Sequence, residues 1–124
     1  MFIEQPFDQF LRFEYERHSD THVTVSMPVE PLYLNSLGII HGGIISSLAD
    51  VAMCNTIESD EDNKQKAVTV DLNISFLKGA RGSRLIAEAE IISSGKTLTH
   101  AQCLIYDENT QLVAKAKAVL FNKQ

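Results

Sequence analysis

Residues 35–50 read NSLGIIHGGIISSLAD and carry the strongest structural signal in the chain. Gly42 and Gly43 lie at the N-terminus of a predicted apolar helix, and Asp50 lies about two turns further along it. Glycine lets another group approach the backbone closely, and the first N–H groups of a helix have no partner within it. With the helix dipole, such N–H groups can hold a negative oxygen. Because a carboxylate on an apolar helix is costly without a partner or a role, the pattern indicates an oxyanion site and a base.

The central helix is expected to run from Gly43 to Ile57. Its apolar side chains cover most of its circumference, namely Ile44, Ile45, Leu48, Ala49, Val51, Ala52 and Met53. A helix that is apolar nearly all round lies inside the protein. A short amphipathic helix is also predicted over residues 4–17, from Pro6 and the helical spacing of Phe7, Phe10, Leu11 and Glu14. The phenylalanines of this segment either cap the core or line an apolar ligand pocket.

The rest of the chain predicts β-structure. Strands are expected over residues 21–27, 67–77, 85–92, 97–106 and 112–121, with short turns such as 93–96 between the later ones. The apolar face of the second strand is predicted to hold Val68, Val70, Leu72, Ile74 and Phe76. Four long strands joined by short turns imply an antiparallel meander, and a buried helix on one face of it gives an α+β domain.

Length and charge limit the possible functions. The 124 residues suffice for one domain, 1–124, and the net charge of −5 argues against a general nucleic-acid binder. The sequence shows neither an apolar run long enough for membrane insertion nor a secretory signal. Cys54 and Cys103 lack metal or redox spacing, so we expect free thiols in a cytoplasmic protein, with one disulfide as the competing interpretation.

The order of these residues resembles one known family. Asn35, His41, Gly42-Gly43 and Asp50, followed by VTVDLNI at 68–74, are similar to the hotdog-fold acyl-CoA thioesterases of the phenylacetate-pathway, PaaI-like type. The resemblance runs from about residue 20 to the end and includes SGKTL at 94–98 and LVAKA at 112–116. An Asp nine residues after the His of an HGG segment is fairly specific. The resemblance implies an antiparallel sheet wrapped around a long central helix.

It also implies roles for individual residues. The N–H of Gly42 would polarise the thioester carbonyl, with Gly43 beside it against the substrate, and Asp50 would activate water or attack directly. His41 and Asn35 would interact with each other and shape the loop. The hydroxyl of Thr69 would position the attacking water. Strand parity places Thr69 opposite the predicted apolar face, so it reaches Asp50 only through a bulge or from a neighbouring subunit.

The spacing of Gly42 and Asp50 predicts a quaternary structure. Eight residues of helix separate the two groups by roughly 12 Å. An oxyanion donor and a base must both lie within a few ångströms of one carbonyl, so one chain cannot supply both. Two antiparallel helices about a two-fold axis can, which predicts a homodimer with two composite sites. The resemblance adds pairing of dimers into a tetramer.

An acyl-CoA substrate also needs cations for the phosphates of coenzyme A. The candidates are Lys78, Arg81, Arg84 and Lys96, a local basic set in or beside turns, with the two arginines preferred. Solvated turn residues are the alternative. Coenzyme A enters only as part of the substrate, and neither a cofactor nor a metal is expected.

Each site residue also has a structural alternative. Asp50 is equally consistent with a buried structural carboxylate that is hydrogen-bonded to the backbone or to Ser46. His41 is consistent with a helix cap, and the two glycines are consistent with a tight loop. A hotdog hydratase or dehydratase, and a non-catalytic binder of acyl-CoA or an acyl carrier protein, are the competing functions.

Three further site types find little support in the sequence. Ser46-Ser47 lacks the glycines of a nucleophile elbow, and no glycine-rich phosphate loop follows a strand. His18 and His22 flank Asp20, but a helix-to-strand junction is expected to separate them, which favours surface histidines over a metal site.

Overall fold

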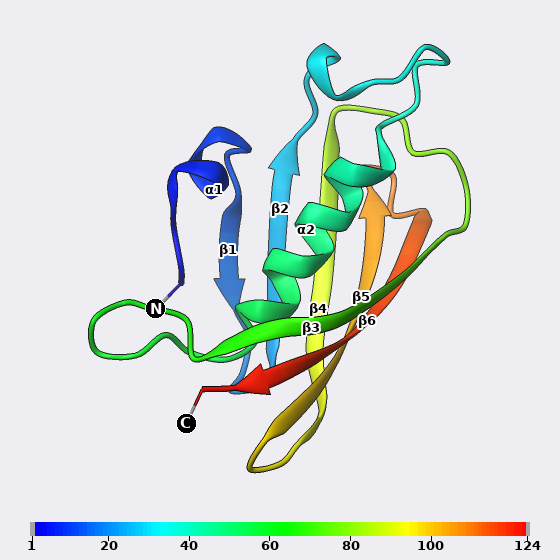
Figure 1. Ribbon diagram of the computed structural model, residues 1–124. Helices are drawn as coiled ribbons and strands as arrows, with labels where there is room; N and C mark the ends of the chain where they lie inside the picture. The colour runs from blue at the N-terminus through cyan, green and yellow to red at the C-terminus, as the bar shows by residue number, and fades with distance from the viewer. Residues whose placement is uncertain (1, 124) are drawn as a thin grey trace.

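The chain folds as one helix lying across the concave face of a curved antiparallel sheet (Figure 1). The computed structural model describes residues 2–123. The helical elements are α1 (Pro6–Phe10), the 3₁₀ turn η1 (Pro31–Tyr33) and α2 (Gly42–Cys54). The strands are β1 (Glu14–Arg17), β2 (His22–Pro28), β3 (Ala67–Phe76), β4 (Arg84–Ser94), β5 (Leu98–Asp107) and β6 (Leu112–Asn122). This is the predicted α+β hotdog arrangement.

The strand order differs from a simple meander. The sheet runs β1-β2-β4-β5-β6-β3, so β4, β5 and β6 form a meander but β3 pairs with β6 rather than with β4. The segment that follows β3 therefore passes β6 and β5 before β4 begins beside β2. As a result, β1 and β3 are the two edge strands.

Small residues on the sheet let α2 pack closely. The buried residues of α2 are Ile45, Leu48, Ala49, Ala52 and Met53. The strands meet them largely with alanines, namely Ala87, Ala89, Ala101, Ala114, Ala116 and Ala118, all buried. Alanine leaves room for the helix inside the curve of the sheet, whereas larger side chains would overpack it. The centre of the domain is thus filled by the helix itself.

The N-terminal segment corrects one prediction. In place of a helix over residues 4–17, α1 ends at Phe10 and β1 begins at Glu14. Arg12 between them has φ of 56°, a left-handed conformation that no helix continues through. Residues 13–17 alternate between buried or half-buried and exposed side chains, which is the period of a strand.

The same correction brings two histidines together. The junction between His18 and His22 is a turn between β1 and β2, not a passage from helix to strand. Their ring centroids lie 4.7 Å apart. The expectation that the two side chains are separated is therefore wrong.

Within residues 2–123, no helix combines the length and apolar character needed to span a lipid bilayer.

Candidate active site

The start of α2 presents unused backbone donors. His41 is the N-cap residue; its carbonyl accepts the N–H groups of Ile44 and Ile45 at 3.0 and 3.3 Å, while its side chain makes no capping bond. Among residues 2–123, no acceptor engages the N–H groups of Gly42 and Gly43. These two donors stand at the positive end of the helix dipole, so they can bind a carbonyl oxygen that gains negative charge.

Asn35 fixes the loop that leads to these glycines. Its Oδ1 accepts the N–H groups of Leu37 and Ile39 at 2.9 and 3.1 Å. The expected interaction of Asn35 with His41 does not include a hydrogen bond between their side chains in the part of the chain described. Instead, the backbone N–H of His41 donates to the carbonyl of Tyr33 at 2.9 Å. Asn35 therefore shapes the loop through the backbone, without a hydrogen bond to the His41 side chain.

Gly42 lies against the end of β3. A Cβ built on this residue would lie 2.9 Å from Cζ of Phe76, closer than real carbon contacts. Any side chain here would displace the aromatic ring that covers the start of the helix. Gly43, by contrast, has open space where its Cβ would stand. Close packing therefore favours glycine at the first position but not at the second.

Asp50 is held by Thr69. The Thr69 hydroxyl donates to Asp50 Oδ1 at 2.6 Å, a short distance typical of a hydrogen bond to a carboxylate. Within residues 2–123 the two donors to this carboxylate are Thr69 and the more distant Cys54 thiol at 3.9 Å, and both reach Oδ1. Ser46, the predicted alternative partner, is not among them. Oδ2 remains available to a water or a substrate.

A bulge in β3 makes the Thr69 contact possible. The pairing of β3 with β6 shifts register between Thr69 and Asp71. Because one extra residue reverses strand parity, Thr69 shares the helix-facing side with Leu72 and Ile74. Val68 and Val70 lie 51% and 59% exposed, so their predicted place on that apolar face is wrong.

A thiol lies beside this pair. Cys54 Sγ is 3.2 Å from Thr69 Oγ1. Burial raises the pKa of the Cys54 thiol to about 11, and the Asp50 carboxylate adds to the rise while the Thr69 contact opposes it. Cys103 is buried elsewhere, and both cysteines are free, as expected. The competing disulfide between these two described residues does not form.

The two ends of α2 open into different cavities. Asp50, Thr69 and Cys54 line a cavity of about 360 Å³. A second cavity, of about 340 Å³, lies at the start of the helix between His41, Gly43 and apolar residues that include Tyr33. The donor half and the carboxylate half of the candidate site are therefore separate within one chain.

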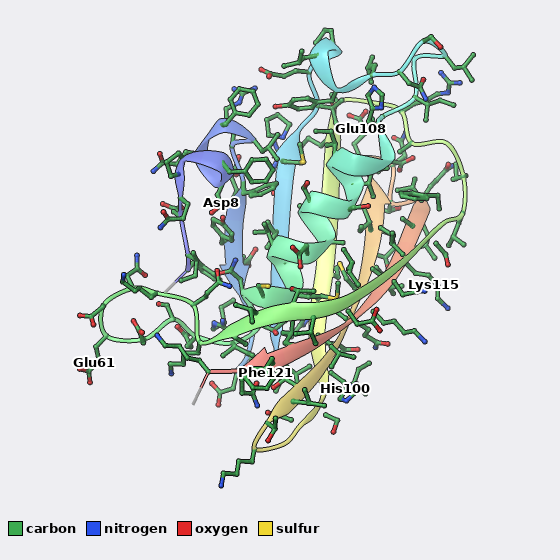
Figure 2. All side chains as sticks on the ribbon, in the orientation of Figure 1. Asp8, Glu61, His100, Glu108, Lys115 and Phe121 are labelled. Carbon is green, nitrogen blue, oxygen red and sulfur yellow. The ribbon has the colours of Figure 1, made fainter. Side chains whose placement is uncertain are left out.

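The N-terminal segment walls the Asp50 cavity, which the sequence pattern did not indicate. Ile3, Gln5 and Asp8 line it, and Figure 2 shows Asp8 on this segment. The backbone N–H of Ile3 donates to Oδ1 of Asn55 at 3.0 Å, which anchors the segment to the end of α2. A buried Asn directly after an apolar helix was the available signal, because a buried amide needs partners.

The basic residues do not form one cluster. Lys96 lies in the β4–β5 hairpin, at the opposite end of β4 from the other three, roughly 33 Å away along the strand. Arg84 alternates with the buried Leu85 and therefore points away from α2, where it donates to Ser26 Oγ at 2.8 Å. Lys78 donates to Gln111.

Arg81 contacts the loop that precedes α2. Its Nη1 lies 3.3 Å from the carbonyl of Leu37 and 3.4 Å from that of Gly38. The predicted local basic set is therefore divided, and Arg81 is the member that contacts the loop leading to α2.

Several known proteins are similar to this chain in sequence. The profile of the Thioesterase superfamily matches residues 37–114. The Medium/long-chain acyl-CoA thioesterase YigI of Escherichia coli K12 is 28% identical, over 95% of this chain and 86% of its own. Acyl-coenzyme A thioesterase 13 of Mus musculus is 31% identical, over 73% of this chain and 66% of its own.

Solved structures agree with the fold. The BH2602 protein of Bacillus halodurans, solved with CoA, is 30% identical with a TM-score of 0.85, covering 98% of this chain and 80% of its own. The Escherichia coli PaaI protein has the same fold with a TM-score of 0.85 at 23% identity, covering 97% and 86%. The chain belongs to the Thioesterase superfamily, shares the hotdog fold with PaaI, and is a thioester hydrolase.

Proposed function

We propose that the protein hydrolyses acyl-CoA thioesters to a carboxylic acid and coenzyme A at a site shared by two chains. Two relatives are named acyl-CoA thioesterases, and one similar structure contains CoA. The observation that carries the shared site is the separation of its parts. The free N–H of Gly42 and the Thr69-bonded Asp50 stand eight residues apart on one helix, roughly 12 Å along its axis.

The edge strand β3 offers a surface for the second chain. One side of β3 pairs with β6, which leaves a row of N–H and C=O groups on its other side. Val68, Val70 and Phe76 on this strand are each more than half exposed. An apolar edge strand is a template for pairing with another copy. These features support a homodimer formed by antiparallel β3 strands.

The same strand relates the two halves of the site. Thr69 near one end of β3 contacts Asp50, and Phe76 at the other end covers Gly42. A two-fold axis near Leu72 and Asn73 would bring the Thr69 end of one strand beside the Phe76 end of the other. Gly42 of one chain would then approach Asp50 of the partner subunit. Pairing of two dimers into a tetramer is a further level of the proposal.

The proposed reaction uses the backbone N–H of Gly42 and the Oδ2 atom of Asp50, neither of which has a hydrogen-bond partner among residues 2–123. The thioester carbonyl oxygen accepts the Gly42 N–H, which stabilises the charge of the tetrahedral intermediate. Thr69 fixes Oδ1 of the carboxylate, so Oδ2 of Asp50 takes a proton from water or attacks the carbonyl carbon itself. In the general-base route the hydroxide forms the new C–O bond, the C–S bond breaks, and the leaving thiolate takes the proton held by Asp50. In the nucleophilic route the thiolate takes a proton from solvent, and water then hydrolyses the anhydride to release the acid and restore Asp50. No cofactor is required, since coenzyme A is part of the substrate, and Arg81 is the proposed contact for its phosphates.

Thiol release from a panel of acyl-CoAs tests this function. Wild-type protein is expected to release thiol, and Asp50→Asn is expected to lower turnover by ~10² or more, the scale for losing a general base. Ser46→Ala, on the same helix, serves as the control. Acyl-CoA that binds but stays intact would indicate a binding protein, and a changed acyl chain without free thiol would indicate a hydratase or dehydratase. Near-normal turnover in Asp50→Asn would refute the assignment of the base.

Isotope labelling separates the two roles of Asp50. In a single turnover in H₂¹⁸O, a general base delivers the label to the product acid. A nucleophile forms an anhydride, and water attack on the protein side of it places the label in Asp50. Mass spectrometry of the peptide that contains Asp50 reads the result.

A further inference from the structure

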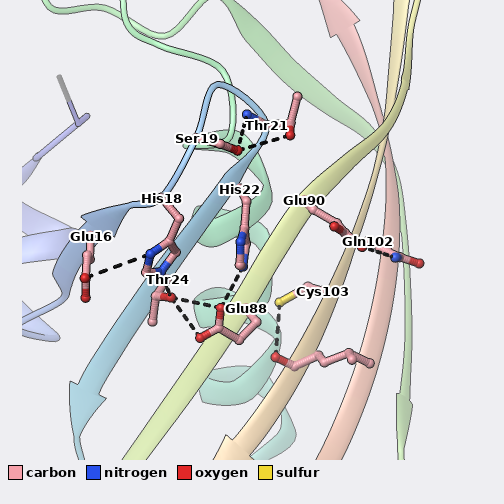
Figure 3. A network of polar contacts seen from close by, with 11 residues as sticks. Glu16, His18, Ser19, Thr21, His22, Thr24, Glu88, Glu90, Gln102 and Cys103 are labelled. Atoms are coloured by element: carbon pink, nitrogen blue, oxygen red, sulfur yellow. Dashed lines mark hydrogen bonds and ion pairs between the residues drawn. The ribbon is translucent and has the colours of Figure 1, made fainter.

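The turn between β1 and β2 brings the imidazole rings of His18 and His22 close together. The N–H groups of His18 and Ser19 both donate to the carbonyl of His22, at 2.9 and 3.3 Å. This closes the hairpin tightly, and the His18 and His22 rings lie 4.7 Å apart on the sheet face away from α2 (Figure 3). The pair is a product of backbone geometry and does not belong to the site on α2.

A carboxylate from the neighbouring strand β4 completes the group. His22 Nε2 lies 2.8 Å from Oε2 of Glu88, which stands on β4. The ligand atoms that His18, His22 and Glu88 can offer all lie within 4.8 Å of one another. Ligand atoms around a tetrahedral Zn²⁺ with bonds of about 2.0–2.1 Å stand about 3.3 Å apart. Small side-chain rotations would close the remaining gap.

The surroundings support these three side chains as ligands. The hydroxyl of Thr24 donates to both Glu88 oxygens at 2.8 and 2.9 Å, which fixes the carboxylate. Oε1 of Glu16 lies 3.9 Å from Nδ1 of His18, on the ring side that faces away from Thr24. A carboxylate behind an imidazole orients the ring and makes it a stronger ligand.

Access and charge also favour a cation. The side chains of His18, His22 and Glu88 are 36%, 39% and 34% exposed, so an ion reaches them directly from solvent. Glu16 and Glu88 add negative charge on the same face of the sheet (Figure 3). Two imidazoles with one carboxylate suit borderline transition metals, whereas Mg²⁺ and Ca²⁺ prefer oxygen ligands alone.

We propose that His18, His22 and Glu88 bind a divalent transition-metal ion such as Zn²⁺, which ties the β1–β2 hairpin to β4. Water would complete the coordination. Because the three ligands come from the β1–β2 turn, from β2 and from β4, the ion would stabilise this edge of the folded domain. The contact of His22 Nε2 with Glu88 and the contact of His18 Nε2 with Thr24 Oγ1, at 2.8 and 2.6 Å, are both replaced by bonds to the metal.

Calorimetric titration of untagged, chelator-treated protein with ZnCl₂ tests the site. One equivalent is expected to bind, and His18→Ala, His22→Ala and Glu88→Gln are each expected to weaken affinity by ~10-fold or more. His100→Ala is the matched control, because this exposed histidine lies on β5 outside the cluster (Figure 2). The affinity of His100→Ala for Zn²⁺ is expected to equal that of the wild type.

Thermal unfolding supplies a second measurement. Zn²⁺ is expected to raise the unfolding midpoint of the wild type and of His100→Ala, but not that of His22→Ala, since an ion that binds only the folded state stabilises it. Unfolding of each variant without metal shows whether it folds. The proposal is overturned if wild-type protein binds no Zn²⁺ saturably, or if His22→Ala and Glu88→Gln bind it as tightly as the wild type.

Discussion

Complementation between two inactive variants tests the shared site directly. Gly42→Pro removes the proposed oxyanion donor with little effect on the helix, because Gly42 is its first residue, where proline fits and no intrahelical bond is lost. His41 has φ of −56° and ψ of 136°, the extended conformation that a residue before proline requires. Gly42→Ala is the control: it places the same Cβ against Phe76 but keeps the N–H.

The expected magnitudes follow from the chemistry and the symmetry. Loss of one oxyanion donor lowers kcat by ~10²–10³, and loss of the base by ~10² or more, so either variant alone retains about 1% activity at most. When equal amounts exchange subunits at random, half of the dimers are mixed. In each mixed dimer one site has both groups intact and the other has neither. The mixture therefore recovers about 25% of wild-type activity.

The assay is thiol release from an acyl-CoA, measured on mixed dimers isolated through two different affinity tags. Isolated mixed dimers are expected to show about half of wild-type activity, since one of the two sites is intact. Intact-complex mass spectrometry verifies their composition. If Gly42 and Asp50 act within one chain, every site in a mixed dimer carries a lesion and activity stays near ~1%. That result would refute the reasoning.

Three further outcomes are expected. Thr69→Val is expected to lower kcat/KM by ~10-fold or more, because a hydrogen bond to a charged group contributes ~1.5–3 kcal/mol. Thr69→Ser keeps the hydroxyl and is expected to stay near wild type, and steady-state kinetics of both variants test this. Arg81→Ala raises KM for acyl-CoA several-fold, most at low salt, whereas Arg84→Ala leaves KM unchanged because its side chain lies on the far face of the sheet. Alkylation of the Cys54 thiol by iodoacetamide is slow at pH 8 and accelerates about tenfold per pH unit towards pH 11, because burial raises its pKa and only the thiolate reacts; fast labelling at pH 8 in the native protein would contradict this.

The central helix and most strands followed from periodicity, but the position of β3 did not. Alternation identifies Ala67–Phe76 as a strand, since apolar and polar residues alternate along it with a period of two. A bulge leaves this alternation in the sequence unchanged, but it reverses which face of the sheet the side chains occupy. The side on which Thr69 lies therefore depends on the pairing with the partner strand. Pairing of β3 with β6 is likewise a long-range choice that local turns cannot specify.

The prediction for the N-terminal segment failed for a different reason. The spacing of Phe7, Phe10 and Leu11 is helical, and α1 does form there. The positive φ of Arg12 then ends the helix, although arginine carries no local signal for that conformation. Phe13 is buried and Tyr15 half-buried in the strand that follows, so tertiary packing overrides the local helical preference.

One feature of the candidate site, the distance between its two key groups, could be predicted from the sequence because helix geometry is nearly invariant. A rise of about 1.5 Å per residue fixes the distance between Gly42 and Asp50 from their sequence positions alone. The three-dimensional arrangement adds that Asp50 and the helix start beside Gly42 lie at separate cavities and that β3 contacts both groups, through Thr69 and Phe76. A single chain thus keeps the proposed oxyanion donor and the proposed base apart, and the unpaired edge strand β3 contacts both. Association through that edge is the simplest arrangement that joins the two, because the strand that supports both groups is also the strand left open to a partner.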